Sequence, residues 1–101
     1  MIGSLPDDRP PLSMFYVYVL KISKGGQLYI GCTNNLRRRI QEHKQQQSEY
    51  AKHRGPLCLV YYEAYLSKKD AQKWEQTLKQ FKGAYGYLRK RIQRSIECDE
   101  A

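Results

Sequence analysis

The sequence has no run of apolar residues long enough to cross a membrane. Its longest such run, Phe15 to Leu20, has the length of a β-strand, whereas a bilayer span needs roughly 20 residues. The N-terminus also lacks the apolar core of a secretory signal peptide. These two absences predict a cytoplasmic protein without a membrane anchor.

Cysteine and proline are scarce. Cys32, Cys58 and Cys98 are odd in number and widely spaced, so they match neither a disulfide framework nor a zinc-ligand pattern. Three of the four prolines lie within residues 1–13, which we interpret as a flexible leader. Met14 comes next and is an alternative start of the protein.

Acidic residues are too few to balance the basic ones. The sequence has 18 Lys and Arg against 10 Asp and Glu, a net charge of +8. Within residues 34–94 the counts are 15 and 5, a local net charge of +10. This distribution favours a polyanionic partner. Nucleic acid is our first interpretation, with an anionic membrane surface or a merely soluble surface as alternatives.

The 101 residues predict one domain, over 14–94, followed by a flexible acidic tail at 95–101. We expect an α+β fold in which a small three-stranded antiparallel sheet is flanked by helices, in the order β-β-α-β-α-α. The pattern predicts strands at Phe15–Ile22, Leu28–Cys32 and Leu57–Leu66, helices at 35–46, 68–82 and 84–95, and a loop at 48–56.

Local signals predict where the helices begin and end. Thr33 or Asn34 can cap the first helix. Ser67 and Asp70 have the spacing of a capping box at the start of the second helix. Gly83 is expected to end that helix.

The first two strands form a predicted hairpin. With a two-residue loop at Gly25-Gly26, Tyr29 pairs with Ile22, and Tyr18 shares a face with Tyr29 and Gly31. The glycine would leave room there for a phosphate or a neighbouring helix. A loop longer or shorter by one residue would reverse the face.

The first helix presents two polar side chains beside its buried stripe. Leu36, Ile40 and His43 have the spacing of that stripe, and Arg39 lies at its edge. A planar guanidinium in this position suits a phosphate. An arginine that extends to solvent and a histidine satisfied within the core are the alternatives.

The second helix places a carboxylate inside its apolar stripe. The stripe is Ala71, Trp74, Leu78 and Phe81, and Glu75 lies within it. A carboxylate that faces a core is costly unless it is paired or binds a metal. An ion pair with a basic side chain and a Mg²⁺ ligand both remain open.

Two further basic segments are weaker signals. Lys52 and Arg54 lie in the predicted loop, and Arg89 and Arg91 lie in the last helix near two tyrosines. These residues suit phosphate contacts and base stacking. A solvated charged surface explains each of them as well.

Together these residues resemble the GIY-YIG nuclease superfamily, most closely its small stand-alone bacterial members. The resemblance covers about residues 14–92. Its first half-motif is Tyr16-Val17-Tyr18 and its second is Tyr29-Ile30-Gly31, and it continues through Cys32–Ile40, Leu59–Glu63 and Trp74-Glu75.

The resemblance implies a role for five side chains. Tyr29 corresponds to the general base, and Tyr18 to the tyrosine that orients water and phosphate or shares proton transfer. Arg39 resembles the arginine that steadies the scissile phosphate, with His43 hydrogen-bonded nearby. Glu75 resembles the single carboxylate that binds Mg²⁺ or Mn²⁺. The expected substrate contacts are Gly31, Lys52, Arg54, Arg89 and Arg91.

Three positions depart from the family pattern. Tyr16 replaces the glycine of the first half-motif, and Cys32 stands where other members have a lysine. Gly86-Tyr87 occupies the region where some members carry an asparagine, which puts the phosphate contact of that asparagine in doubt.

The sequence therefore predicts a metal-dependent endonuclease. Hydrolysis of a phosphodiester needs an activated water, charge stabilisation and a protonated leaving group, and one carboxylate favours a one-metal mechanism. We expect structured or damaged DNA as the substrate, in repair or recombination, with a protein partner as a possible means of targeting. A catalytically weak or inactive nucleic-acid-binding module and an RNA-directed nuclease are the alternatives.

Overall fold

The computed structural model describes residues 13–22, 26–54 and 57–97, and within 46–54 the backbone alone. The three strands form one antiparallel sheet, with the first strand of the chain between the second and the third, so the predicted α+β fold is confirmed. No described helix is both long and apolar enough to cross a bilayer. The elements are β1 (Phe15–Ile22), β2 (Gln27–Thr33), α1 (Leu36–Arg54), β3 (Leu57–Tyr65), α2 (Lys68–Gln80), α3 (Lys82–Arg91) and α4 (Gln93–Glu97).

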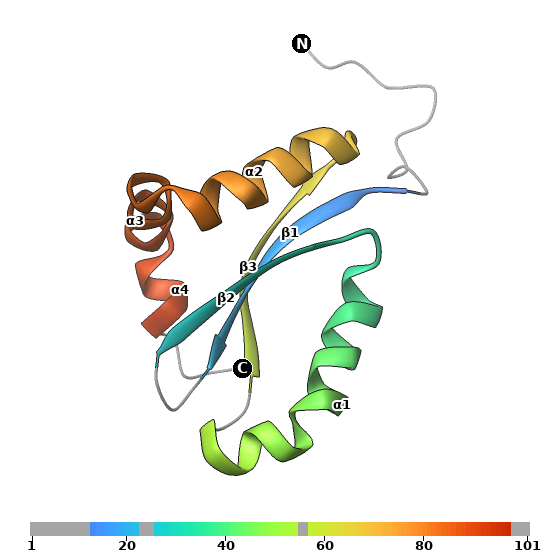
Figure 1. Ribbon diagram of the computed structural model, residues 1–101, viewed down its shortest axis with the longest axis vertical. Helices are drawn as coiled ribbons and strands as arrows, with labels where there is room; N and C mark the ends of the chain where they lie inside the picture. The colour runs from blue at the N-terminus through green and yellow to red at the C-terminus, as the bar shows by residue number, and fades with distance from the viewer. Residues whose placement is uncertain (1–12, 23–25, 55–56, 98–101) are drawn as a thin grey trace.

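Helices cover both faces of the sheet. In Figure 1, α2 crosses one face, with α3 and α4 beyond its end, and α1 lies against the other face. Val17 and Val19 of the central strand belong to the core on the α2 side, together with Leu78 and Leu88. Successive strand residues alternate in direction, so Tyr18 points to the α1 side.

The β1–β2 hairpin keeps the predicted face but not the predicted register. Ile22 pairs with Gln27 rather than with Tyr29. Gly26 adopts a positive φ of 66° and donates its N–H to the Ile22 carbonyl at 2.9 Å. A shift of two residues leaves every side chain on its original face. Tyr18 and Tyr29 therefore lie together as expected.

Helix α1 is longer than the sequence predicted. It continues to Arg54, so the expectation of a loop at 48–56 is wrong over 48–54, and residues 55–56 lie outside the described residues. Residues 36–54 contain no glycine or proline that would interrupt the helix.

The cap of α1 also differs from the expectation. Asn35 Oδ1 accepts the Arg38 N–H at 3.1 Å, so neither Thr33 nor Asn34 is the capping residue. Thr33 instead orients the cap, because its hydroxyl oxygen accepts the Asn35 N–H at 3.1 Å.

Helix α2 begins as predicted but ends earlier. The Ser67 hydroxyl accepts the Asp70 N–H at 3.3 Å, which confirms the cap. Phe81 has an extended backbone, with φ −116° and ψ 114°, and it ends the helix. Gly83 therefore lies inside α3. Phe81, expected in the buried stripe, is 60% exposed because the helical spacing stops one residue before it.

The last predicted helix is divided into α3 and α4 by Ile92, whose ψ of 23° departs from helical geometry. Ile96 of α4 is buried in the core, and Lys21 Nζ donates to its carbonyl at 2.5 Å. Residues 95–97, which we expected in a tail, therefore belong to the packed domain. The remaining tail, 98–101, and residues 1–12 of the expected leader lie outside the described residues.

Candidate active site

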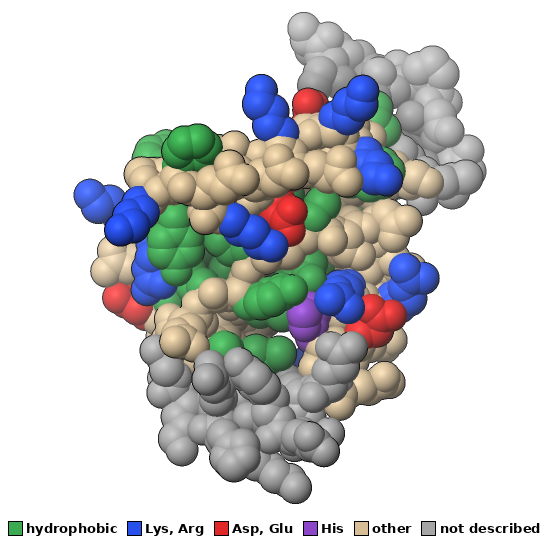
Figure 2. All heavy atoms as spheres, viewed as in Figure 1, with side chains coloured by type: hydrophobic (Ala, Val, Ile, Leu, Met, Phe, Trp, Pro, Cys, Tyr) green, Lys and Arg blue, Asp and Glu red, His purple; other side chains and the backbone are tan. Residues whose placement is uncertain are grey.

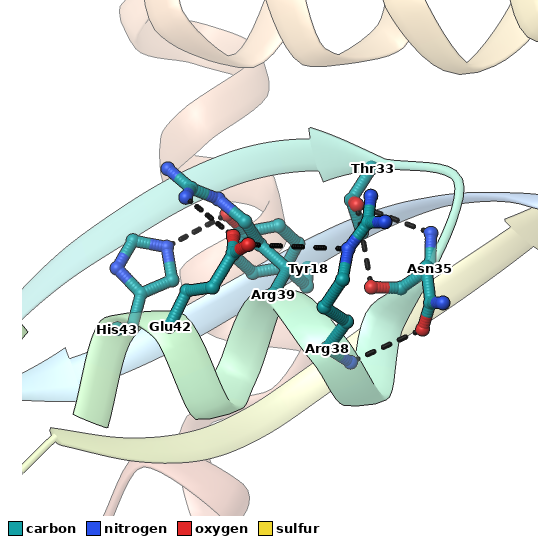
Figure 3. Close-up of polar contacts among 7 residues, drawn as sticks. All are labelled: Tyr18, Thr33, Asn35, Arg38, Arg39, Glu42 and His43. Atoms are coloured by element: carbon teal, nitrogen blue, oxygen red, sulfur yellow. Dashed lines mark hydrogen bonds and ion pairs between the residues drawn. The ribbon is translucent and has the colours of Figure 1, made fainter. Parts of the chain in front are cut away.

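Three ring side chains meet on the α1 side of the sheet. Ring centroids are 6.4 Å apart for Tyr18 and Tyr29, 5.8 Å for Tyr18 and His43, and 5.1 Å for Tyr29 and His43. The Tyr18 hydroxyl lies 2.9 Å from His43 Nε2 (Figure 3). Tyr18 is 1% exposed and Tyr29 is 42% exposed. Tyr29 thus presents its ring to solvent, whereas Tyr18 is enclosed.

Gly31 makes the position of the Tyr18 ring possible. The two residues are paired across the strands, and a Cβ atom at position 31 would lie 2.5 Å from Tyr18 Cζ and 2.9 Å from Cε1. The expectation that Gly31 leaves room for a phosphate or a helix is therefore wrong, because the Tyr18 ring takes that room. Its role as a substrate contact stays a prediction.

Burial sets the protonation of the enclosed pair. It raises the pKa of Tyr18 above the usual 10.0, although a hydrogen bond with Arg39 opposes the shift. Burial, followed by the nearby Arg39 guanidinium, lowers the pKa of His43 below the usual 6.5. Both groups are therefore neutral at pH 7, and the imidazole tautomer decides which one donates the hydrogen bond between them.

Arg39 is oriented by Glu42, a residue that the sequence analysis missed. Arg39 Nη1 donates to Glu42 Oε1 at 3.0 Å, and Arg38 Nε lies 3.9 Å from Oε2 (Figure 3). The hydrogen bond to Glu42, and after it the one to Tyr18, raises the pKa of Arg39. The i,i+3 spacing of Arg39 and Glu42 is the sequence signal that could have identified this pair.

Arg39 and Glu75 line one cavity of about 550 Å³ at the end of β2. Arg39 comes from α1 and Glu75 from α2, which lie on opposite faces of the sheet, so the cavity bends around the edge strand. The negative charge of Glu75 influences groups on both faces of the sheet. Together with burial, which has the larger effect, it raises the pKa of Tyr18 and of Cys32. Figure 2 shows a histidine bordered by basic and acidic side chains on one face of the molecule.

Glu75 forms one of the two contacts that the sequence left open. Lys79 Nζ lies 3.0 Å from its Oε2, and the Glu75 side chain remains 20% exposed. Among the described residues, no group of three His, Cys, Asp or Glu converges on a metal position. Mg²⁺ commonly uses one or two carboxylates and completes its shell with water and phosphate oxygens. The donor set is therefore that of a one-carboxylate site.

The other predicted substrate contacts lie apart from one another. Arg89 Nη1 donates to the Tyr85 hydroxyl at 3.1 Å, and Tyr85 lines a second cavity together with Tyr29. Arg91 lines a different cavity, with Arg94. The side chains of Lys52 and Arg54 lie outside the described residues.

Comparison with known proteins identifies several relatives. The family model of the GIY-YIG catalytic domain matches residues 14–91. A UPF0213 protein of Clostridium perfringens is 45% identical over 67 residues, which cover 65% of this chain and 71% of that protein. A UPF0213 protein of Staphylococcus haemolyticus is 38% identical over 71 residues, covering 69% and 85%. The solution NMR structure of a UPF0213 protein from Bacillus halodurans is 34% identical, with a TM-score of 0.49, and covers 74% of this chain and 81% of that one.

Proposed function

This chain belongs to the GIY-YIG catalytic domain family, which is a nuclease family, and we propose that it is a metal-dependent endonuclease that hydrolyses phosphodiester bonds in DNA. The observation that carries the proposal is the cavity at the end of β2, to which α1 contributes Arg39 and α2 contributes Glu75. A cation and a carboxylate that line one cavity suit a phosphate beside the first and a divalent metal beside the second.

In this proposal Arg39 holds the scissile phosphate. Glu42 and Tyr18 both hydrogen-bond its guanidinium, so its direction is set before substrate arrives. A donor that is already oriented needs no rearrangement as negative charge develops on the phosphate. Tyr18 and His43 therefore position Arg39 and the neighbouring ring of Tyr29.

Tyr29 is the phenol that meets the attacking water. Tyr29 is exposed, whereas Tyr18 is enclosed and its hydroxyl is hydrogen-bonded to His43. Phenols ionise at about pH 10, so a tyrosine accepts a proton from water only where positive charge favours the phenolate. The Arg39 side chain also hydrogen-bonds Tyr29, so a cation lies beside the phenol that faces the water in this proposal.

Glu75 would hold Mg²⁺ or Mn²⁺, and water and phosphate oxygens would complete the shell. A bound cation polarises the phosphate and lowers the pKa of coordinated water. The half-exposed Lys79 pairs with this carboxylate and would have to release it for a cation to bind. Binding is measurable without turnover: Mn²⁺ should broaden NMR signals of residues around Glu75 in the wild type, and the broadening should disappear in Glu75→Gln.

A cleavage assay with Mg²⁺ or Mn²⁺ tests the function. The substrates are single-stranded, nicked, flapped and branched DNA, with RNA alongside. Arg39→Ala should slow cleavage roughly 100- to 1,000-fold. Arg38→Ala is the matched control, because Arg38 is the adjacent arginine, contacts the same Glu42 and is 63% exposed against 34% for Arg39; its cleavage rate should change little.

The outcomes separate the alternatives. Equal cleavage by Arg39→Ala and the wild type would place the activity elsewhere. A wild type that binds DNA and cleaves none of the substrates favours a binding module, and cleavage of RNA alone favours an RNA-directed nuclease. Preference for flapped or branched DNA supports a role in repair or recombination.

A further inference from the structure

A second cavity, of about 450 Å³, adjoins the candidate active site at Tyr29. It lies between the edge strand β2 and the junction of α2 with α3. Its residues are Leu28, Tyr29, Ile30, Leu78, Lys79, Phe81, Lys82 and Tyr85. Lys79 of this α2–α3 groove is paired with Glu75 of the Arg39 cavity at 3.0 Å, so the groove lies next to the proposed phosphate site.

The α2–α3 groove combines an apolar lining with aromatic walls and a basic rim. Leu28, Ile30 and Leu78 supply the apolar lining, and Ile30 and Leu78 are buried. Lys79 and Lys82 supply positive charge, and among the described residues no Asp or Glu lines the groove. An apolar surface bordered by Lys82, and by Lys79 in its ion pair with Glu75, matches a ligand that has a flat hydrophobic part and a negative part.

Phe81 is exposed at this groove for a structural reason. The backbone leaves the helical conformation at Phe81 and returns to it at Lys82, which directs a large aromatic side chain to the surface, 60% exposed. Tyr85, one turn further along α3, is fixed by Arg89, whose guanidinium carbon lies 5.8 Å from the ring centroid. Two aromatic rings therefore border the groove, and one of them is braced by a cation.

We propose that the α2–α3 groove binds an unpaired nucleotide that flanks the scissile phosphate, with its base against Phe81 and Tyr85 and its phosphate beside Lys82. Base stacking on aromatic side chains, combined with basic residues along the backbone, is the general mode of single-strand binding. The cavity also has the volume of a ligand site. This inference deepens the proposed nuclease function by naming a substrate feature, and it rests on that function only for its position.

Binding of DNA without metal tests the proposal, measured by fluorescence anisotropy with labelled single-stranded and single-strand-flanked oligonucleotides. Phe81→Ala should weaken binding at least about fivefold through the lost stacking, and Phe81→Tyr should restore it. Tyr62→Ala is the matched control, since Tyr62 is 51% exposed and lines a cavity with α1 residues instead. The melting temperatures of Phe81→Ala and Tyr62→Ala should match that of the wild type, because the Phe81 and Tyr62 rings are both exposed.

Salt dependence tests the basic rim separately. Lys82→Gln should reduce the slope of log affinity against log salt by about 0.7, the value for one phosphate contact on a single strand. Lys73→Gln, which removes an exposed charge elsewhere on α2, should leave the slope unchanged.

Three results would overturn the proposal: wild-type affinity in Phe81→Ala, an equal loss in Tyr62→Ala, or an equal loss on a fully paired duplex. None of these measurements needs cleavage. A wild type that fails to cut DNA while Phe81→Ala weakens binding would leave the groove in place and remove the nuclease function.

Discussion

Two carboxylates of this domain, Glu63 on β3 and Glu75 on α2, have opposite surroundings. Glu63 accepts hydrogen bonds from the Tyr61 hydroxyl at 2.8 Å, the Tyr65 hydroxyl at 2.5 Å and Trp74 Nε1 at 3.2 Å. Glu75 pairs with the flexible Lys79 and lines an open cavity. The first carboxylate is surrounded by fixed protein donors, and the second can exchange its partner.

If Glu75 binds the metal as proposed, one helix serves both stability and function. Ring-borne donors have few rotatable bonds, so Glu63 attaches Trp74 of α2 firmly to β3. Trp74 directly precedes Glu75 in the sequence. The hydrogen bond from Trp74 to Glu63 therefore fixes the rotation of α2 about its axis, and with it the direction of Glu75 towards the cavity. A carboxylate with rigid partners stabilises the fold, whereas one with a mobile partner remains available to a ligand.

The largest expected effect is on activity at Glu75. Glu75→Gln removes the charge that would bind the metal, and cleavage should fall by roughly 100-fold or more. The melting temperature should change little, because the lost ion pair is with a half-exposed lysine. Glu97→Gln, an exposed change on α4, is the control. Wild-type cleavage by Glu75→Gln would contradict the assignment of Glu75 to metal binding.

The next effect is on stability at Glu63. Glu63→Ala leaves two phenols and an indole N–H without their acceptor, which should cost about 1–3 kcal/mol and lower the melting temperature by roughly 5–20 °C. Glu63→Gln keeps one acceptor oxygen and should lose less. Thermal unfolding followed by circular dichroism provides the measurement. A smaller loss of stability in Glu63→Ala than in Glu75→Gln would contradict the assignment of Glu63 to stability and of Glu75 to function.

Gly31→Ala extends the comparison to Tyr18, the enclosed tyrosine on the α1 side of the sheet. The new methyl group forces the Tyr18 ring away from its position, at an expected cost of about 1–3 kcal/mol for overpacking. Gly83→Ala is the control, because nothing lies within 4 Å of a Cβ atom there and the substitution is in a helix. Chemical denaturation should show a loss for the first variant and none for the second.

At alkaline pH the Glu63 cluster should lose stability. Burial, and after it the bond to Glu63, raises the pKa of Tyr61 and of Tyr65 above the usual 10.0. The unfolded chain therefore releases these protons first, so the contribution is complete below about pH 10 and is lost as pH rises towards the native pKa values. Denaturation curves at increasing pH should show this loss, and Tyr65→Phe should reduce it.

The smallest effect is expected at His43, on the acid side. Its pKa is lowered by burial, so the unfolded chain binds the proton more tightly. The contribution of the neutral imidazole is complete above the ordinary pKa of 6.5 and is lost as pH falls below it. An NMR titration should give a midpoint below 6.5 for His43, identified by its absence in His43→Gln. A higher midpoint would contradict the enclosed neutral pair.

Local patterns in the sequence were sufficient for the strands, the shared face of Tyr18 and Tyr29, and the inward positions of Arg39 and Glu75. These follow from residue periodicity, and the face survived a wrong register because the error was two residues. The donors around Glu63 come from two separate elements, which no local spacing reveals. The exposure of Phe81 was also missed, because helix α2 ends there without a glycine or proline to mark it.

The edge position of β2 has a consequence for contacts between copies of the chain. An edge strand can pair with another strand, and charged side chains along it oppose such association. Among the described residues, the two cavities beside β2 are lined by four basic side chains, Arg39, Lys68, Lys79 and Lys82, and by one carboxylate, Glu75. The positive charge proposed to attract a polyanion thus also repels a second β2 edge, and rising ionic strength weakens this attraction and this repulsion together.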